Sequence, residues 1–169
     1  MKHTCYALAL TLAFGSLGCG DGDSGSPNID VEGTVAGQSL EVRDAVIILR
    51  TEEGFNGETT ERLDIYAYND GILLFCPDVA TPADVGDLGI DIRLEAPQIT
   101  EGRYEIGSDE LEAAWVCDDE SICDLFGIDA TSGTLEIESV SPSVVGTFTF
   151  DFEGEVVTGS LDVQISCME

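Results

Sequence analysis

Ser132-Gly133-Thr134-Leu135-Glu136-Ile137-Glu138-Ser139-Val140 begins a C-terminal region in which apolar and polar residues alternate. The same period of two continues through Thr147-Phe148-Thr149-Phe150-Asp151-Phe152 and Ser160-Leu161-Asp162-Val163-Gln164-Ile165-Ser166-Cys167. Successive side chains of a β-strand point to opposite faces, so each stretch predicts a strand with one buried and one solvated face. Ser141-Pro142-Ser143 and Glu153-Gly154-Glu155 separate the stretches as turns. The region therefore predicts three consecutive antiparallel strands.

The preceding part of the chain carries the same pattern in short segments. Strands are expected at Asp30–Val35, Leu40–Arg50, Glu61–Tyr68, Ile72–Cys76, Leu88–Glu95, Arg103–Ile106 and Leu111–Val116. Asn69-Asp70-Gly71, between two apolar segments, is typical of a hairpin turn. About nine or ten short strands joined by tight turns predict an all-β fold, an antiparallel β-sandwich or barrel.

The first 18 residues have the organisation of an export signal. Lys2 gives a positive start, and Tyr6–Phe14 is an apolar segment interrupted only by Thr11. This segment is shorter than the roughly 20 residues that a membrane-spanning helix needs. Together with Gly15-Ser16-Leu17-Gly18-Cys19, it resembles the signal peptide and lipobox of bacterial lipoproteins, which are cleaved before a cysteine that then carries the lipid.

That resemblance implies a signal peptide at residues 1–18, lipid on Cys19, and a protein held on the periplasmic or cell-surface side of a bacterial membrane. Ser16 stands where a lipobox usually has Leu, and the small residues Ser16 and Gly18 also suit ordinary signal peptidase. Residues 19–28 contain no large apolar residue, so we expect the lipidated cysteine and a flexible tether there. A single β-domain is then expected over residues 29–169.

The number of cysteines favours lipidation. Cys5 lies in the predicted signal peptide, and lipid on Cys19 leaves the even set Cys76, Cys117, Cys123 and Cys167. Ordinary cleavage would instead leave one odd thiol in an oxidising compartment.

Four cysteines allow three pairings, and the sequence alone does not choose among them. Alternation places Cys167 on the same strand face as Ile165 and Cys76 on the same face as Leu74, so both are expected to point into the core. We expect disulfides between Cys76 and Cys167 and between Cys117 and Cys123. The second pair is not a Cys-x-x-Cys motif and encloses acidic residues that raise thiol pKa values, which disfavours a redox role.

The charge balance limits the partners. The chain has 34 acidic residues against 6 basic ones and a formal net charge of −28 at pH 7. Such a surface repels phosphate backbones and anionic lipid headgroups, so we expect no direct nucleic-acid partner and favour cations or basic partners. Solubility, together with adaptation to a salty habitat, is the favoured explanation of the charge, ahead of specific binding of divalent cations.

The absent residue types limit the chemistry. His3 and Lys2 are the only residues of their kinds, and both lie in the predicted signal peptide. The remaining chain therefore lacks the base of a Ser-His-Asp or Cys-His nucleophile, a Schiff-base lysine and a His-containing zinc site. Carboxylate pairs such as Asp151 with Glu153 and Glu136 with Glu138 are expected by chance among so many acids. We expect no enzymatic activity and no required cofactor.

Two binding sites are candidates. Asp118, Asp119, Glu120 and Asp124 lie in or beside the loop that the local disulfide would close, and packed carboxylates suit calcium. A solvated acidic loop is the alternative, because the spacing is not that of an EF-hand.

The second candidate is a sugar-binding surface. Tyr66 and Tyr68 alternate with Ile65 and Ala67 and so share the opposite strand face, and further aromatics stand at Tyr104 and Trp115. Exposed flat aromatics stack on sugars. Alternatively, these rings fill the second face of a sandwich.

The C-terminal third also resembles a pattern in small bacterial lipoproteins of unknown function. An SGT strand (Ser132-Gly133-Thr134), a GTF strand (Gly146-Thr147-Phe148) and a TG strand (Thr158-Gly159) close the domain, after an upstream Gly102-Arg103-Tyr104. Leu161 departs from the usual aromatic residue. The resemblance implies an all-β envelope lipoprotein. From the sequence as a whole we expect a binding or structural role in the envelope, with an envelope protein or glycan as partner. A calcium-dependent or carbohydrate-binding module is the alternative, and the oligomeric state stays open.

Overall fold

The computed structural model describes residues 28–53, 57–70, 72–75, 79–82, 88–116 and 127–168, and all its regular elements there are strands. They are β1 (Asn28–Glu32), β2 (Asp44–Glu53), β3 (Thr59–Tyr68), β4 (Ile72–Phe75), β5 (Val79–Pro82), β6 (Gly89–Ala96), β7 (Gly102–Glu105), β8 (Glu110–Val116), β9 (Ile128–Asp129), β10 (Ser132–Ser139), β11 (Ser143–Phe152) and β12 (Glu155–Met168). The predicted all-β fold is confirmed.

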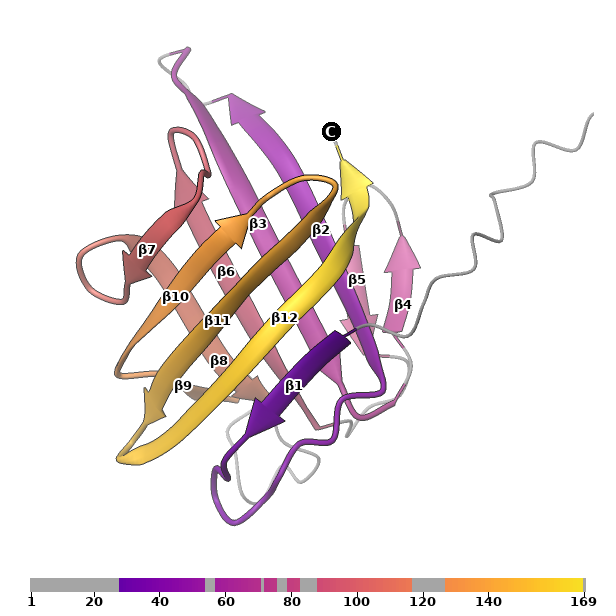
Figure 1. Cartoon of the computed structure of the whole chain (residues 1–169), viewed down its shortest axis with the longest axis vertical. Helices are drawn as coiled ribbons and strands as arrows, with labels where there is room; N and C mark the ends of the chain where they lie inside the picture. Colours follow the sequence, from indigo (N-terminus) through magenta and orange to yellow (C-terminus); the bar gives the residue numbers. More distant parts are fainter. Residues whose placement is uncertain are drawn as a thin grey trace, which may run out of the picture.

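One curled sheet contains ten of these strands. Its order is β7-β10-β11-β12-β2-β3-β6-β8-β9, with β1 paired to β12 beside this path, and β4 and β5 form a separate two-stranded ribbon. In Figure 1 the half made of β7, β10, β11, β12 and β1 crosses in front of the half made of β2, β3, β6, β8 and β9. The arrangement is a half-barrel in which the sheet packs against itself.

Strand direction differs from the prediction at one place. β12 runs parallel to β2, with Ile165 opposite Ile47 and Cys167 opposite Ile48, whereas the other pairs are antiparallel. The sheet is therefore mixed. A strand's alternation sets which residues share a face but carries no information on the direction of its neighbour.

The core lies between the two halves of the sheet. β11 contributes Phe148, Phe150 and Phe152 to it. The rings of Phe152 and Trp115 meet edge to face at 6.0 Å and so join β11 to β8 of the other half. Burial of each such side chain stabilises the fold by about 1.5–3 kcal/mol, so these aromatics hold the two halves together.

The face of β2, β3 and β6 that points away from this core is also partly buried. We call it the outer face. Val46 and Ile48 of β2 are buried there and pack with Tyr66 and with Ile72, the first residue of β4. The Ile72 N–H donates to Oδ2 of Asp44 at 2.9 Å. The run Ala45–Leu49 is apolar at successive positions because both faces of β2 are covered here.

Several predictions concern residues outside the described ranges. These are the signal peptide, the lipid on Cys19, most of the tether, Cys76, Cys117 and Cys123, and the candidate calcium ligands Asp118, Asp119, Glu120 and Asp124. β1 begins at Asn28, one residue before the expected start of the domain. Within the described residues, no helix has the length and apolar character needed to cross a membrane.

Candidate functional site

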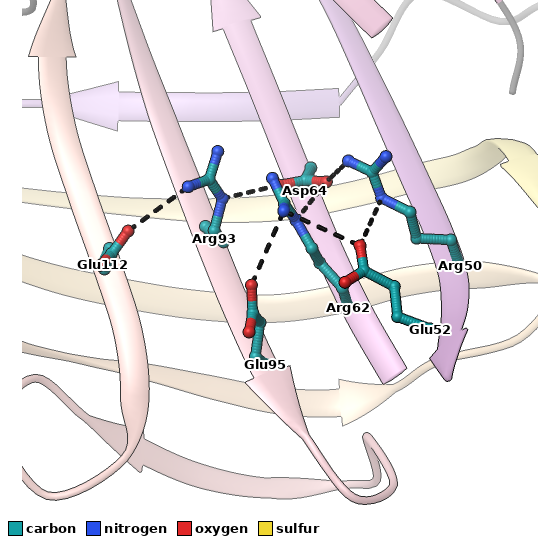
Figure 2. A network of polar contacts seen from close by, with 7 residues as sticks. All are labelled: Arg50, Glu52, Arg62, Asp64, Arg93, Glu95 and Glu112. Carbon is teal, nitrogen blue, oxygen red and sulfur yellow. Dashed lines mark hydrogen bonds and ion pairs between the residues drawn. The ribbon is translucent and has the colours of Figure 1, made fainter. Parts of the chain in front are cut away.

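Asp64 of β3 is the centre of a polar cluster on the outer face. It is only 1% exposed and is the one buried charged residue in the described part of the chain. Its carboxylate accepts hydrogen bonds from Nη2 of Arg50 at 2.5 Å, from Nε of Arg62 at 3.0 Å and from Nε of Arg93 at 3.2 Å. Figure 2 shows the three guanidinium groups converging on it from β2, β3 and β6. A buried carboxylate needs such charged partners to offset its lost hydration.

Three glutamates surround this cluster. Oε1 of Glu52 lies 3.7 Å from Nε of Arg50, Oε1 of Glu95 lies 3.7 Å from Nη1 of Arg62, and Oε2 of Glu112 lies 3.6 Å from Nη1 of Arg93. These ion pairs are more exposed and longer, so each contributes little to stability. Burial lowers the pKa of Arg93, but the hydrogen bond and charge of Asp64 outweigh it and leave that pKa raised. Arg93 therefore remains charged, and its guanidinium group is held by Asp64 at Nε and by Glu112 at Nη1.

A neighbouring row of residues crosses the same face. Tyr66 of β3 is opposite Asp91 of β6, Asp91 is opposite Ala114 of β8, and Ala114 is opposite Asp129 of β9. Paired residues of adjacent strands share a face. The small side chain of Ala114 therefore separates two carboxylates, and the row is hollow at this point.

Asp91 has an unusual environment for a carboxylate. The hydroxyl of Tyr68 donates a 2.7 Å hydrogen bond to its Oδ1. Burial raises the pKa of Asp91 to about 6, the charge of Asp64 adds to the rise, and the hydrogen bond from Tyr68 and the charge of Arg93 oppose it. Among the described residues, neither Asp91 nor Asp129 takes part in an ion pair.

A shallow pocket of about 390 Å³ opens over this row, and we call it the Tyr66 pocket. Its lining combines carboxylates, one guanidinium, one aromatic ring and small or apolar residues: Asp64, Tyr66, Asp91, Ile92, Arg93, Ile106, Leu111, Glu112, Ala113, Ala114, Asp129 and Ala130. A few fixed polar groups in an apolar hollow are the usual composition of a small-ligand site.

A second hollow, of about 320 Å³, lies over β1, β11 and β12. Threonine and serine hydroxyls line it together with Asp30 and Glu32. Its polar side chains are exposed, so it lacks the fixed polar groups that distinguish the Tyr66 pocket.

The predicted sugar-binding surface is only partly right. Tyr66 and Tyr68 share the outer face, as alternation predicted, and Tyr66 borders the pocket. Tyr68, however, is 2% exposed, and Trp115 is wholly buried in the core. The hydroxyl of Tyr104 bonds to the backbone of Thr100. An exposed platform of several aromatics is therefore not present among these residues, and the alternative, that the rings fill the second face of the sheet, holds for Tyr68. Alternation does not reveal which second faces are covered.

The other predicted carboxylate pairs are not brought into a pocket. Glu136 and Glu138 lie exposed on β10. Oδ1 of Asp151 accepts a 2.6 Å hydrogen bond from the Gly154 N–H in the turn after β11, where Glu153 has a φ of 57°. These residues serve a solvated face and a turn. In the described ranges, no group of three or more His, Cys, Asp or Glu residues is placed to hold a metal ion.

Sequence reasoning did not single out Asp64, Asp91, Arg93 or Ala114. A signal was present, since Asp64 stands between Leu63 and Ile65 in a strand of strong apolar character. Alternation alone assigns such an aspartate to a solvated face, and burial of that face depends on the neighbouring strands.

No protein-family model, curated protein or solved structure matches this chain. The chemistry of the site follows from its own geometry.

Proposed function

We propose that this chain is an exported, lipid-anchored and non-catalytic lipoprotein of the bacterial envelope that binds a ligand in the Tyr66 pocket. The observation that carries the binding role is the pocket of about 390 Å³ beside Tyr66, Asp91 and Arg93. Binding costs less when the contacting groups are already ordered. Arg93 is held by Asp64 and Glu112, and Asp91 is held by Tyr68.

The proposed anchor is supported by the N-terminal sequence. The apolar segment Tyr6–Phe14, the small residues before Cys19 and the even number of cysteines after it fit a lipidated product.

The non-catalytic role is supported by the composition. With no histidine after His3 and no lysine after Lys2, nucleophilic and Schiff-base mechanisms lack their usual groups. Burial raises the pKa of Asp91 to about 6, and the hydrogen bond from Tyr68 holds this carboxyl group in place as a binding group.

The anchor is tested by expressing the full chain in a bacterial host with a radiolabelled fatty acid. Cys19→Ser should abolish labelling and shift the protein from the membrane to the soluble fraction, and Cys5→Ser is the matched control. Labelling that persists in the Cys19→Ser protein would contradict the proposed anchor.

The binding role is tested by NMR of the mature protein against a panel of small polar compounds that includes neutral oligosaccharides. A ligand of the Tyr66 pocket should shift the resonances of Tyr66 and Ala114. Ala114→Leu should remove binding because the added side chain fills the hollow between Asp91 and Asp129. Ligand binding that is unaffected by Ala114→Leu would place the site elsewhere.

A carbohydrate is the second candidate ligand. Tyr66 lines the pocket beside hydrogen-bonding groups of both signs, which are the elements that sugar sites combine. The oligosaccharide arm of the panel tests it directly.

The alternative of a calcium site depends on residues outside the described ranges, so it is tested separately. Unfolding is compared in millimolar calcium and in monovalent salt of equal ionic strength, for the parent and for an Asp118→Asn, Asp119→Asn double variant. Calcium-specific stabilisation that the double variant loses would support a cation site, and equal effects of both salts would oppose it.

A further inference from the structure

We propose that the Tyr66 pocket takes a primary ammonium group on an alkyl chain, which sits above Ala114 between the carboxylates of Asp91 and Asp129. This inference rests on the proposed function, because it names the ligand class of the same pocket.

The lining of the pocket is anionic. It includes four carboxylates, those of Asp64, Asp91, Glu112 and Asp129, and one guanidinium, that of Arg93. Arg93 is occupied by Asp64 at 3.2 Å and by Glu112 at 3.6 Å. Neither Asp91 nor Asp129 forms an ion pair with a described residue, although the charge of Arg93 acts on Asp91 from a distance. The unbalanced negative charge is therefore in the row that contains Ala114.

The strand register leaves space for a ligand between the carboxylates of Asp91 and Asp129. Ala114 is the direct cross-strand neighbour of Asp91 on one side and of Asp129 on the other. Strands lie about 4.8 Å apart, so the two aspartate backbones are separated by two such intervals. A methyl group lies between them, which leaves room for a small cationic head that reaches both carboxylates.

Tyr66 supplies the neighbouring wall. It is half-buried, lines the pocket and is the cross-strand partner of Asp91. Aromatic rings attract cations through their π-face and also pack against methylene groups. An ammonium group at Asp91 with its alkyl chain along Tyr66 satisfies both the charged and the apolar part of the lining.

The environment of Asp91 fits this ligand. Burial raises its pKa to about 6 although the hydrogen bond from Tyr68 and the charge of Arg93 oppose the rise, so the carboxylate is not fully compensated in the free protein. A bound ammonium would supply that cation and would favour the ionised form.

Other ligand classes fit less well. Anions would face four carboxylates in the lining. A divalent cation needs six to eight oxygen ligands, and in the described residues no group of three or more carboxylates is placed to hold a metal. An ammonium group needs only two or three acceptors. Asp91, Asp129 and the ring of Tyr66 meet that smaller requirement.

The ammonium group has two sources, a free polyamine or a lysine side chain of a partner protein. Calorimetric titration of the mature full-length protein in non-ionic detergent distinguishes them, with pentane-1,5-diamine and Nα-acetyl-lysine N-methylamide as probes at equal ionic strength. Nα,Nε-diacetyl-lysine N-methylamide is the neutral probe. Tighter binding of the diamine indicates a polyamine, and tighter binding of the lysine probe indicates a protein partner.

We expect at least one charged probe to bind at least tenfold more tightly than the neutral probe. Asp91→Asn should weaken that binding at least tenfold, and it keeps a side-chain oxygen that can accept the hydrogen bond from the Tyr68 hydroxyl. Asp129→Asn should weaken the binding to a smaller extent. Asp162→Asn removes the same charge from an exposed position of β12 and should change the affinity less than twofold. Circular dichroism melts verify that each variant is folded.

Three results would overturn the inference. They are absence of binding by both charged probes, equal losses in Asp91→Asn and Asp162→Asn, and equal affinity for charged and neutral probes. If a neutral probe or sugar binds and Ala114→Leu removes that binding, the proposed function stands without the ammonium ligand. If no probe binding depends on Ala114, both fail.

Discussion

The hydroxyl of Tyr68 donates a 2.7 Å hydrogen bond to Oδ1 of Asp91 on the adjacent strand. Tyr68 is itself buried, and its ring lies against the backbone of Gly89 at the start of β6. Glycine thus allows an aromatic side chain to lie flat on the sheet and to orient the carboxylate of the Tyr66 pocket. The pair Tyr68 and Asp91 thus supplies both a buried packing contact and a carboxylate that lines the Tyr66 pocket.

The stability of the protein should depend on pH through Asp91. The pKa of Asp91 rises from 3.8 to about 6 on folding, so the folded state binds a proton that the unfolded state releases between these values. Protonation of Asp91 therefore contributes its full share to the free energy of unfolding below about pH 4. This contribution is lost as the pH rises through 6, and the total loss is at most about 3 kcal/mol. Asp91→Asn should remove this loss. Urea unfolding of both proteins at pH 4 and pH 7.5 measures it, and an equal pH dependence in both would contradict the prediction.

Tyr68→Phe should raise the pKa of Asp91 further. The hydrogen bond from Tyr68 lowers that pKa, while burial raises it, and the substitution removes only the bond. A titration followed by the carboxyl carbon resonance of Asp91 gives both values. Tyr104→Phe is the control, because its hydroxyl bonds to Thr100 instead. A pKa that is unchanged or lower in Tyr68→Phe would oppose this account.

Asp64→Asn should destabilise the protein strongly. It leaves the guanidinium groups of Arg50, Arg62 and Arg93 around a neutral side chain, and removal of one partner of a buried ion pair costs about 3–5 kcal/mol. Glu52→Gln removes an exposed member of the same cluster and should cost about 1 kcal/mol or less. Equilibrium unfolding in urea gives both free energies. Similar values for the two variants would show that Asp64 is not the centre of the cluster.

Gly89→Ala should be costly only while Tyr68 is present. A Cβ at residue 89 would clash with the ring of Tyr68, and overpacking of this kind costs about 1–3 kcal/mol. In a Tyr68→Ala background the same change should cost little. A double-mutant cycle of unfolding free energies tests the coupling. Additive effects of the two changes would contradict the close packing.

Peptide mapping under non-reducing conditions tests the predicted disulfides. We expect Cys76 joined to Cys167 and Cys117 joined to Cys123, and loss of the longer bridge should cost about 4–5 kcal/mol by the chain-entropy model. The backbone of Cys167 pairs with Ile48 after a register shift that separates it from Ile165. A different pairing in the map would contradict this prediction.

The strands could be predicted from local sequence patterns, but the site could not. Alternation at Phe148, Phe150 and Phe152 correctly predicted one buried face, since all three are in the core. The same alternation placed Tyr66 and Tyr68 together but left their exposure open. Tyr68 became buried through Gly89 and Asp91, which are distant in the chain and adjacent in the sheet. A site assembled from β3, β6, β8 and β9 depends on strand order, which a local period does not contain.

The amino-acid sequence by itself determined that the domain is all-β and which residues share a strand face, because the pleat of a strand fixes a period of two. Tertiary structure alone decided that β12 runs parallel to β2, that three arginines meet at Asp64, and that Ala114 lies between Asp91 and Asp129. These features depend on which strands become neighbours. That choice is made by burial of the whole apolar surface, which is a property of the folded chain and of no single segment.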